Sequence, residues 1–578
     1  MSELQESLLG HAEKDWTKIA MTSILQSLSL DENVPPLNLA EYYTDPAVAS
    51  FLVRWAVTPK MRRVLDPGCG DGVFLCAVAQ LVKQRSKENK LELIGIELSP
   101  SALSQARENN GESHHVKLRM LRRNFFEVSK RDLGPVDAVV GNPPFIRHHG
   151  FKGRQLETAL ERCLEAGVDL PRTASSWAHF VIHGCSMLRP GGRLALVLPE
   201  ELLVAEYSRV VWRFLRRQFE RILVLSANSS IFHSVEQRTV LLLGDNAARG
   251  PATVNIGRFS GLGSIGRIKI ESLWLRSRVL PVAEIIDKNK RASDYLVHSE
   301  ILNLYRKLAR RVGIARLSSF GSIRIGYVTG DNDFFILTKD EIERWSIPHD
   351  FLLPTVSKAR EISGTYFTLA EWSARFSSGD ARALLRISAT PWESLPSEVR
   401  TYLEFGKSQG VTNRYHCRSR EPWYSVRNVR AGDLILKSLA VGPPLLAWNP
   451  DSVSVSNSLN QVFINSQADS LLPQEVAVAS LTSLTYLSTK IEGHRLSGGL
   501  WKLEPREASR IAIVYPEDES IRKELRALRT PLQRWLGNGQ WSYAMEKIDE
   551  LLLDGYLGLP RSNRKALVRA INRIERRA

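Results

Sequence analysis

The tetrapeptide Asn142-Pro143-Pro144-Phe145 is the part of this sequence best suited to chemistry on a planar nitrogen compound. It follows the apolar run 136–141, which is typical of a buried strand. The Asn142 side-chain oxygen and the Pro143 carbonyl can accept hydrogen bonds from an amino group, and the Phe145 ring can stack on the heterocycle that carries it. An ordinary Pro-Pro turn after a strand would give the same sequence pattern. The residues upstream are therefore needed to choose between a turn and a site.

A glycine-rich turn at 66–72, Asp-Pro-Gly-Cys-Gly-Asp-Gly, lies between a short β-rich run and a helical pattern. Its glycines, Gly68 and Gly70 among them, would let the backbone approach a ligand at the N-terminus of the following helix. A second apolar run ends about 30 residues later at Glu97, where an acid is the expected partner of two ribose hydroxyls. Two other interpretations stay open: Glu97 could end a strand in solvent, and Asp66 could cap a helix.

Strand and helix patterns alternate from about 38 to 245, which predicts an α/β fold with a largely parallel sheet covered on both faces. The expected strands are 63–66, 92–97, 116–120, 137–140, 193–198, 222–225 and 239–243, and the expected helices are 46–57, 73–86, 100–109, 174–188 and 200–218. Parallel sheets bind ligands at the carboxyl ends of their strands. The glycine turn, Glu97, Asn124 and Asn142 fall at such ends, so we expect them to meet at one edge.

These segments resemble the class I methyltransferases that use S-adenosylmethionine, and more narrowly the gamma-class N6-adenine DNA methyltransferases. The resemblance implies a Rossmann-like domain with a seven-stranded, mostly parallel sheet, followed by an α+β target-recognition domain. It also implies S-adenosylmethionine as the cofactor, bound by Asp66, Gly68, Gly70 and Glu97. Thr44, in the run Tyr-Tyr-Thr-Asp-Pro, would hold the methionine end of this cofactor.

The same resemblance implies that Asn142, Pro143 and Phe145 are the catalytic residues. The run 230–240 is similar to the late segment of the family whose aromatic residue contacts the target base. In this chain that residue is Phe232, which would clamp the base together with Phe145, and a core aromatic is an equal alternative for Phe232.

Three features depart from the family pattern. In the segment for the methionine end of the cofactor, Asp45 stands between Thr44 and Pro46, so each of these residues stays a candidate for the ligand contact. Phe145 stands where the family usually has tyrosine, so stacking survives but the phenol hydroxyl is lost. Asn124 stands where the family usually has aspartate, and its amide oxygen can still accept from the amino group of the cofactor's adenine. The neighbouring Phe125 would form a wall of that pocket.

The expected reaction is direct in-line methyl transfer. Two acceptors holding the adenine amine, the Asn142 oxygen and the Pro143 carbonyl, would turn its lone pair toward the methyl donor. A base inside duplex DNA cannot reach a buried cofactor, so it must be extruded into the pocket.

Composition fits a protein that binds a polyanion. The 578 residues are enough for two or three domains, and the formal net charge of +16 favours nucleic acid or an anionic membrane surface. No apolar run approaches the roughly 20 residues that a membrane span needs, and the N-terminus lacks an apolar signal core. We therefore predict a cytoplasmic protein without a membrane partner, whose partner is duplex DNA and whose oligomeric state is open.

Five scattered cysteines are typical of reduced thiols in the cytosol, and none forms a Cys-x-x-Cys pair, so no metal site is expected. None follows a proline, which argues against the covalent chemistry of the cytosine-C5 methyltransferases. His148 and His149, next to the tetrapeptide, are assigned no chemistry.

The predicted organisation has four parts. These are a helical lead at 1–37, the methyltransferase domain at 38–248, a turn-rich connector at 249–320, and a target-recognition domain at 321–578 that ends in basic helices. The lead has no room for a nuclease site, so any cutting activity would sit on a separate restriction endonuclease or another defence-system subunit.

Three other functions stay open. Asn-Pro-Pro also occurs in protein-glutamine methyltransferases, although those chains are much shorter and lack a large C-terminal half. An RNA base methyltransferase would carry the same pocket. The departures at Asn124 and Phe145 also leave room for a catalytically weakened DNA-binding specificity protein.

Overall fold

The computed structural model describes residues 44–85, 91–110, 114–227, 239–259, 268–287, 291–297, 299–440, 442–465, 472–495 and 500–575. The predicted helical lead at 1–37 and the base-contact candidate Phe232 lie outside these described residues. None of the helices in the described part is long and apolar enough to cross a membrane.

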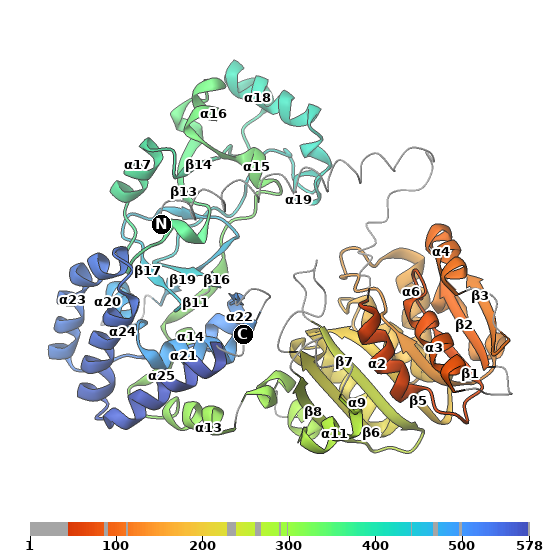
Figure 1. Ribbon diagram of the computed structural model, residues 1–578. Coiled ribbons are helices and arrows are strands. Elements are labelled where there is room, and N and C mark those ends of the chain that lie inside the picture. Colours follow the sequence, from red (N-terminus) through yellow and green to blue (C-terminus); the bar gives the residue numbers. More distant parts are fainter. Residues whose placement is uncertain are drawn as a thin grey trace, which may run out of the picture. The chain divides into compact units, whose positions relative to one another are not determined.

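The first half of the described chain is built on one mixed sheet, which Figure 1 shows with its helices. Within the described residues this sheet has nine strands in the order β3-β2-β1-β4-β5-β7-β6-β8-β9. The strands are β1 (Arg63–Asp66), β2 (Leu91–Glu97), β3 (Val116–Arg122), β4 (Val136–Gly141), β5 (Leu188–Pro199), β6 (Phe219–Ala227), β7 (Thr239–Ala247), β8 (Thr253–Phe259) and β9 (Arg278–Val279). The first five in spatial order run parallel, and β7 is antiparallel to both of its neighbours.

This arrangement confirms the predicted mostly parallel sheet, and it adds two strands to the expected seven. Strands β8 and β9 come from the segment that was predicted to be a connector. Strand β8 pairs in parallel with β6 along its whole length, and β9 pairs with β8. The segment predicted as a connector therefore contributes strands to the sheet of the first half, and it does more than link the two halves.

Residue alternation along the central strands explains why both faces of the sheet are covered. In β1, Val64 packs into the core on one face and Leu65 into the core on the other. Both are fully buried, as expected for strands with helices on each side. The first face is covered by α2 (Pro46–Ala56), α3 (Val73–Gln84), α4 (Pro100–Asn110) and α11 (Ile270–Arg276). The second is covered by α6 (Gly153–Glu165), α7 (Ser176–Met187), α8 (Glu201–Val204), α9 (Ser208–Gln218) and α12 (Val282–Asp287).

The second half is an α+β region with its own cores, whose strands pair across long stretches of chain. One four-stranded sheet has the order β11-β19-β15-β17, and another has the order β12-β14-β13-β18. Their strands are β11 (Gly321–Ile325), β12 (Ile336–Leu337), β13 (Leu352–Val356), β14 (Arg382–Leu385), β15 (Leu434–Lys437), β17 (Leu446–Trp448), β18 (Ser454–Val455) and β19 (Leu459–Ile464).

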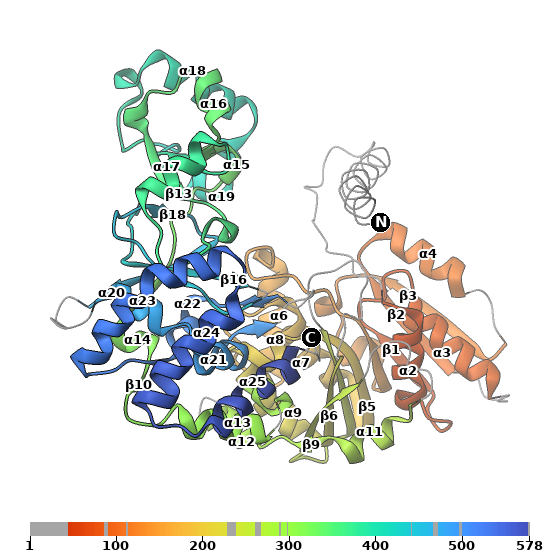
Figure 2. The same ribbon diagram turned by 60° about the vertical axis from the view of Figure 1, so that its left-hand side comes forward.

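Helices of the last hundred residues pack on the first of these sheets and on one another (Figure 2). They are α20 (Pro473–Ala479), α21 (Ser483–Glu492), α23 (Glu519–Gly537), α24 (Trp541–Asp549) and α25 (Arg561–Glu575). Helix α25 is the predicted basic tail helix, and it buries Leu567 and Ile571. Its Arg564 lies 3.3 Å from Asp554, so this cation is already paired within the domain.

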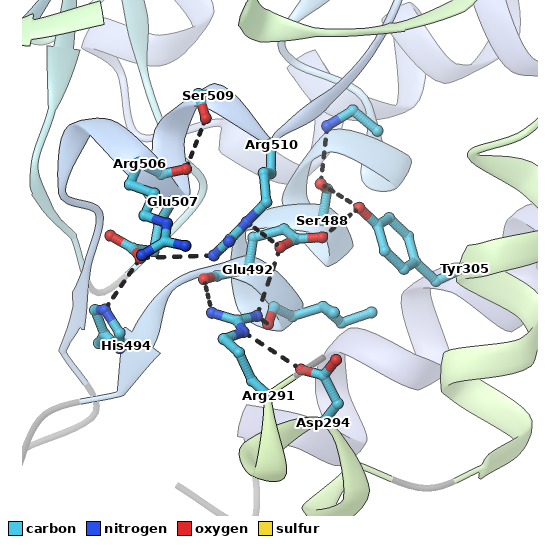
Figure 3. A network of polar contacts seen from close by, with 12 residues as sticks. Arg291, Asp294, Tyr305, Ser488, Glu492, His494, Arg506, Glu507, Ser509 and Arg510 are labelled. Carbon is cyan, nitrogen blue, oxygen red and sulfur yellow. Dashed lines mark hydrogen bonds and ion pairs between the residues drawn. The ribbon is translucent and has the colours of Figure 1, made fainter. Parts of the chain in front are cut away.

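A polar network fastens the segment at Arg291 to the C-terminal end of α21 (Figure 3). The Arg291 guanidinium donates to the main-chain carbonyls of Ile491 and Glu492, which are the last carbonyls of the helix and have no partner within it. The Glu492 carboxylate lies 2.9 Å from Arg510 Nε and accepts from the Tyr305 hydroxyl. Arg291 precedes strand β11 in the sequence, and it is already bonded to helix α21 of the second half.

Candidate active site

The ends of strands β1, β2 and β4 meet at one edge of the sheet, and this edge carries the predicted site residues. These strands end at Asp66, Glu97 and Gly141, directly before or within the runs singled out above. A Cβ atom built on Gly68 would lie 3.5 Å from Pro144 Cδ, so the glycine turn and the tetrapeptide are in contact. The expected meeting of these two motifs is therefore what the structure shows.

The glycine turn is held against the end of β2. Gly70 adopts a φ of +50°, which favours glycine, and its N–H donates to Glu97 Oε2 at 3.0 Å. The other oxygen, Oε1, accepts from the N–H groups of Leu98 and Ser99. Glu97 is thus fixed by three backbone donors. Of the roughly four lone-pair sites of a carboxylate, about one remains, on Oε2, to accept from a ligand hydroxyl.

Asp66 is a buried carboxylate whose acceptors are not used up by the surrounding protein. It is 1% exposed, and its Oδ1 accepts only a long bond of 3.5 Å from the Gly68 N–H. Within the described residues, Oδ2 accepts no hydrogen bond. Burial raises the pKa of Asp66 well above its usual value, and the nearby negative charges of Glu97 and Asp71 raise it further. A buried acceptor of this kind suits a ligand that brings N–H donors or positive charge.

The start of α2 distinguishes Thr44 from the two residues that begin the helix. Asp45 is the N-cap of this helix, and its side chain accepts from the Ala47 N–H at 2.7 Å. Pro46 is the first helical residue. Thr44 is buried and takes no part in the cap, so it keeps its place as the candidate ligand residue.

Asn124 and Phe125 lie just beyond the end of β3. The Asn124 side-chain oxygen accepts from the Phe126 N–H at 3.1 Å and so caps a short 3-10 helix at 125–127. An amide oxygen has a second lone pair, which leaves it able to accept from a ligand as well. The Phe125 ring is nearly fully buried and stacks on Phe180, with 5.4 Å between the ring centroids.

The tetrapeptide follows β4 directly, with Asn142 half-buried and Pro143 buried. Phe145 is 7% exposed and belongs to the core on the α7 face of the sheet. The main chain on either side of this ring is held by one residue of α7. The Ile146 N–H donates to Ser176 Oγ at 2.9 Å, the Ser176 N–H donates to the Ile146 carbonyl at 3.0 Å, and the Ser176 hydroxyl donates to the Pro144 carbonyl.

Ser176 was not singled out in the sequence. Two serines before an apolar helical run look like helix caps, and this was the only signal available. The structure instead turns the Ser176 hydroxyl away from its own helix and toward the tetrapeptide.

Helix α7, which carries Ser176, also carries two buried histidines, His179 and His183. Burial lowers the pKa of both His179 and His183 to about 4, so both rings are neutral near neutral pH. His179 Nδ1 lies 3.3 Å from the Ser175 carbonyl, and His183 Nε2 lies 2.9 Å from the Val128 carbonyl. They pack against the rings of Phe125 and Phe151, which indicates a structural role.

Comparison with known families divides the chain into two matched parts. A family model described as N-6 DNA Methylase matches residues 37–213. A second, described as Type II methyltransferase M.Eco57I, C-terminal domain, matches residues 289–553.

Individual relatives agree with these matches. The chain is 20% identical over 555 residues to Type II methyltransferase M.AccI of Acinetobacter calcoaceticus, covering 94% of this chain and 96% of the relative. Its first part is 26% identical over 155 residues to a tRNA1(Val) (adenine(37)-N6)-methyltransferase of Yersinia enterocolitica, covering 26% of this chain and 55% of the relative. Among solved structures, the Type IIL restriction-modification enzyme MmeI in complex with DNA has a TM-score of 0.50 at 13% identity, covering 92% of this chain and 75% of that one, which shows a shared fold.

The strand order, the antiparallel strand β7 between β5 and β6, and the glycine turn beside an acid define a Rossmann-like methyltransferase domain. The family matches make the identification more specific. The two family matches, together with a relative matched over nearly its whole length, support a gamma-class N6-adenine methyltransferase of a restriction–modification system, with S-adenosylmethionine as its cofactor. The buried, underused acceptors of Asp66 fit a cofactor that carries an amino group and a positive charge.

Proposed function

We propose that this chain methylates the exocyclic N6 of an adenine that has been extruded from duplex DNA, at a specific sequence. The contact between Gly68 and Pro144 carries the proposal, since it puts the amine-holding tetrapeptide directly beside the cofactor turn. Methyl transfer needs the two reacting atoms within about 3–3.5 Å and in line, so the two motifs have to share one pocket.

On the substrate side, the Asn142 side-chain oxygen and the Pro143 carbonyl would each accept one N–H of the adenine amine. Holding both N–H groups out of the ring plane favours a tetrahedral nitrogen, because its lone pair is then less delocalised into the ring. The amine nitrogen would attack the methyl carbon directly, so that the new nitrogen–carbon bond replaces the carbon–sulfur bond and a neutral thioether leaves. The nitrogen would then lose one proton, and no covalent bond to the protein would form. Phe145 and Phe232 are the proposed contacts of the extruded base, and the loss of a phenol at Phe145 leaves stacking as its contribution.

On the cofactor side, bound S-adenosylmethionine supplies a methyl group on a good leaving group. Glu97 would accept from a ribose hydroxyl, and the Asn124 oxygen from the amino group of the cofactor's adenine. Asp66 and Thr44, both buried, would hold the polar groups at the other end, and Phe125 would form part of the adenine pocket wall.

Adenine specificity is supported from two directions. The family model that matches residues 37–213 is described as N-6 DNA Methylase, and the tRNA enzyme is named for the N6 of adenine. The tRNA relative matches only the first part of this chain, whereas M.AccI matches nearly all of it. This difference in coverage favours DNA over RNA as the substrate, since the second half would then serve as the target-recognition domain.

The net charge of +16 supports a polyanionic partner, because neutralising phosphates releases counterions from duplex DNA. Cutting, where it accompanies this modification, would come from a separate endonuclease or another subunit. We place the reaction in the cytoplasm, a choice supported by five cysteines that are all free thiols.

The test is to incubate the full chain with isotopically labelled S-adenosylmethionine and one of three acceptors: mixed-sequence duplex DNA, total RNA, or protein. The product is digested and the modified residue is identified by mass spectrometry. We expect labelled N6-methyladenine from duplex DNA. Labelled cytosine would overturn the base assignment, and labelled RNA or protein alone would overturn the substrate. No label, together with weak or absent cofactor binding by calorimetry, would favour a weakened specificity protein.

A further inference from the structure

Ser176 is the residue that fixes the main chain of the tetrapeptide. It is fully buried, and three hydrogen bonds join it to residues 144 and 146, on either side of Phe145. The Pro144 carbonyl and the Ile146 N–H and carbonyl are therefore held together by one side chain and its own peptide group. Neither end of the Phe145 residue can rotate without breaking one of these bonds.

The start of α7 that carries Ser176 is itself locked in place by its neighbours. Glu201, at the start of α8, accepts from the hydroxyl of Ser175 at 3.1 Å and from the indole N–H of Trp177 at 3.1 Å. Its Oε2 also accepts from the Tyr207 hydroxyl at 2.7 Å. Ser175 and Trp177, on either side of Ser176, thus donate to one carboxylate. These bonds hold the start of α7 in place, and they fix the position from which the Ser176 hydroxyl reaches the tetrapeptide.

We propose that Ser176 is a positioning residue for methyl transfer, an inference that rests on the function proposed above. Ser176 donates to the Pro144 carbonyl. The Pro143 carbonyl, one residue earlier, is the group that would accept from the target amine. Because both prolines restrict φ, fixing the Pro144 peptide leaves little freedom to the Pro143 carbonyl. Phe145 is fixed in the same way, so one serine sets the direction of an amine acceptor and the place of a stacking ring.

This role predicts a loss of rate and not a loss of binding. Small displacements of a positioning group can cost about 100-fold in rate because the reacting atoms leave the in-line geometry. The cofactor turn, by contrast, is held by Glu97 and does not depend on Ser176. The binding of cofactor and the chemical step should therefore respond differently when the hydroxyl is removed.

The experiment uses the full chain with the substitutions Ser176→Ala and Ser176→Cys. Alanine removes the hydroxyl, whereas cysteine keeps a similar volume but is a weak hydrogen-bonding group. Ser186→Ala is the matched control, because Ser186 lies on the same helix and its hydroxyl bonds only to His183, within α7. Single-turnover methyl transfer is measured at saturating S-adenosylmethionine and saturating unmethylated duplex DNA, and cofactor affinity is measured by calorimetry.

We expect Ser176→Ala to lower the single-turnover rate by about 10- to 100-fold, Ser176→Cys to lower it less, and Ser186→Ala to leave it unchanged. Cofactor affinity should stay within about twofold of the wild type in all three. A Ser176→Ala rate equal to that of the wild type would overturn the proposal, as would cofactor affinity falling in parallel with the rate. If the alanine variant does not fold, the comparison of cysteine with wild type decides in the same way.

The wild-type chain separates this inference from the proposed function. Failure of the wild type to label adenine in DNA would contradict the proposed function itself. Normal labelling by the wild type, together with equal rates in all variants, would contradict only the role of Ser176.

Discussion

Pro144 packs directly against Gly68, with 3.5 Å between Pro144 Cδ and the position a Cβ atom would take on the glycine. The same added atom would lie 3.8 Å from the Phe180 ring. There is room for one methyl group at this position and for little more. An alanine at position 68 would therefore make ordinary van der Waals contact, whereas a longer side chain would press the glycine turn and the tetrapeptide apart.

Replacing Gly68 therefore gives a graded test of this contact. We expect Gly68→Ala to keep most of the methyl transfer rate, and Gly68→Leu to lower it by more than about tenfold, since the larger side chain must push the two motifs apart. The measurement is single-turnover methyl transfer to duplex DNA. Gly442→Leu is a suitable control, because a Cβ at Gly442 would meet nothing within 4 Å. A leucine at position 68 that transfers methyl groups as fast as the control would show that the contact is not needed.

Removing the amide at Asn142 should stop the chemistry and spare the cofactor. We expect Asn142→Ala to lower the transfer rate by about 100-fold or more, in line with the loss of a group aimed at the reacting centre. S-Adenosylmethionine binding should be largely unchanged, because the residues of the glycine turn and Glu97 are intact. Calorimetry and labelled methyl transfer together measure both quantities, and near-normal turnover by this variant would refute the assigned role.

Cofactor binding should strengthen as the pH rises. Burial raises the pKa of Asp66, so the empty site holds a proton at pH values where an ordinary aspartate is ionised. A positively charged cofactor with N–H donors favours the ionised carboxylate, so binding releases this proton, and affinity grows with pH until the raised pKa is passed. Calorimetry in buffers of different ionisation enthalpy measures the proton release. Asp66→Asn should abolish it, and an unchanged release in that variant would assign the proton to another group.

The two buried histidines should make the methyltransferase domain sensitive to mild acid. The pKa of His179 and of His183 is about 4 in the folded chain, against about 6.5 for an unfolded histidine. The unfolded chain therefore binds more protons between these values, and the free energy of unfolding falls as the pH drops from 6.5 toward 4, by up to about 3 kcal/mol for each ring.

The check is the melting temperature between pH 4 and pH 7 for the wild type and for His183→Gln. Whatever its melting temperature at pH 7, the variant should lose less of it on acidification than the wild type. Parallel curves for the two proteins would mean that His183 does not contribute to the pH dependence.

Much of the sheet edge that carries the candidate site could be predicted because its residues follow short apolar runs typical of buried strands. Strand β1 begins and ends where it was expected, and Asp66, Glu97 and Asn142 fall at strand ends for the same reason. Strand β8 was missed because Gly257 reads as a turn signal in a turn-rich stretch. In the structure Gly257 is a strand residue whose missing side chain makes room for Ser277, and a Cβ there would lie 2.3 Å from its hydroxyl. A single sequence does not distinguish a glycine needed for close packing from one needed for a turn.

The second half was less predictable because its sheets join segments that are distant in sequence. Strand β11 at 321–325 pairs with β19, which lies more than a hundred residues later, and neither strand carries a signal for the other. The role of Ser176 is a similar case. Its bonds to Pro144 and Ile146 cross about 30 residues, so local patterns indicate only a helix start.

The anchoring of Arg291 on the last carbonyls of α21 has a practical consequence for exchanging specificities between related chains. A hybrid joined near residue 320 would take α21 from the donor chain and keep Arg291 from the host. The host arginine would then face the carbonyls of a helix with a different sequence. Joining the two sequences just ahead of residue 291 would transplant the cation and its acceptors together, and such hybrids should fold where the later junction does not.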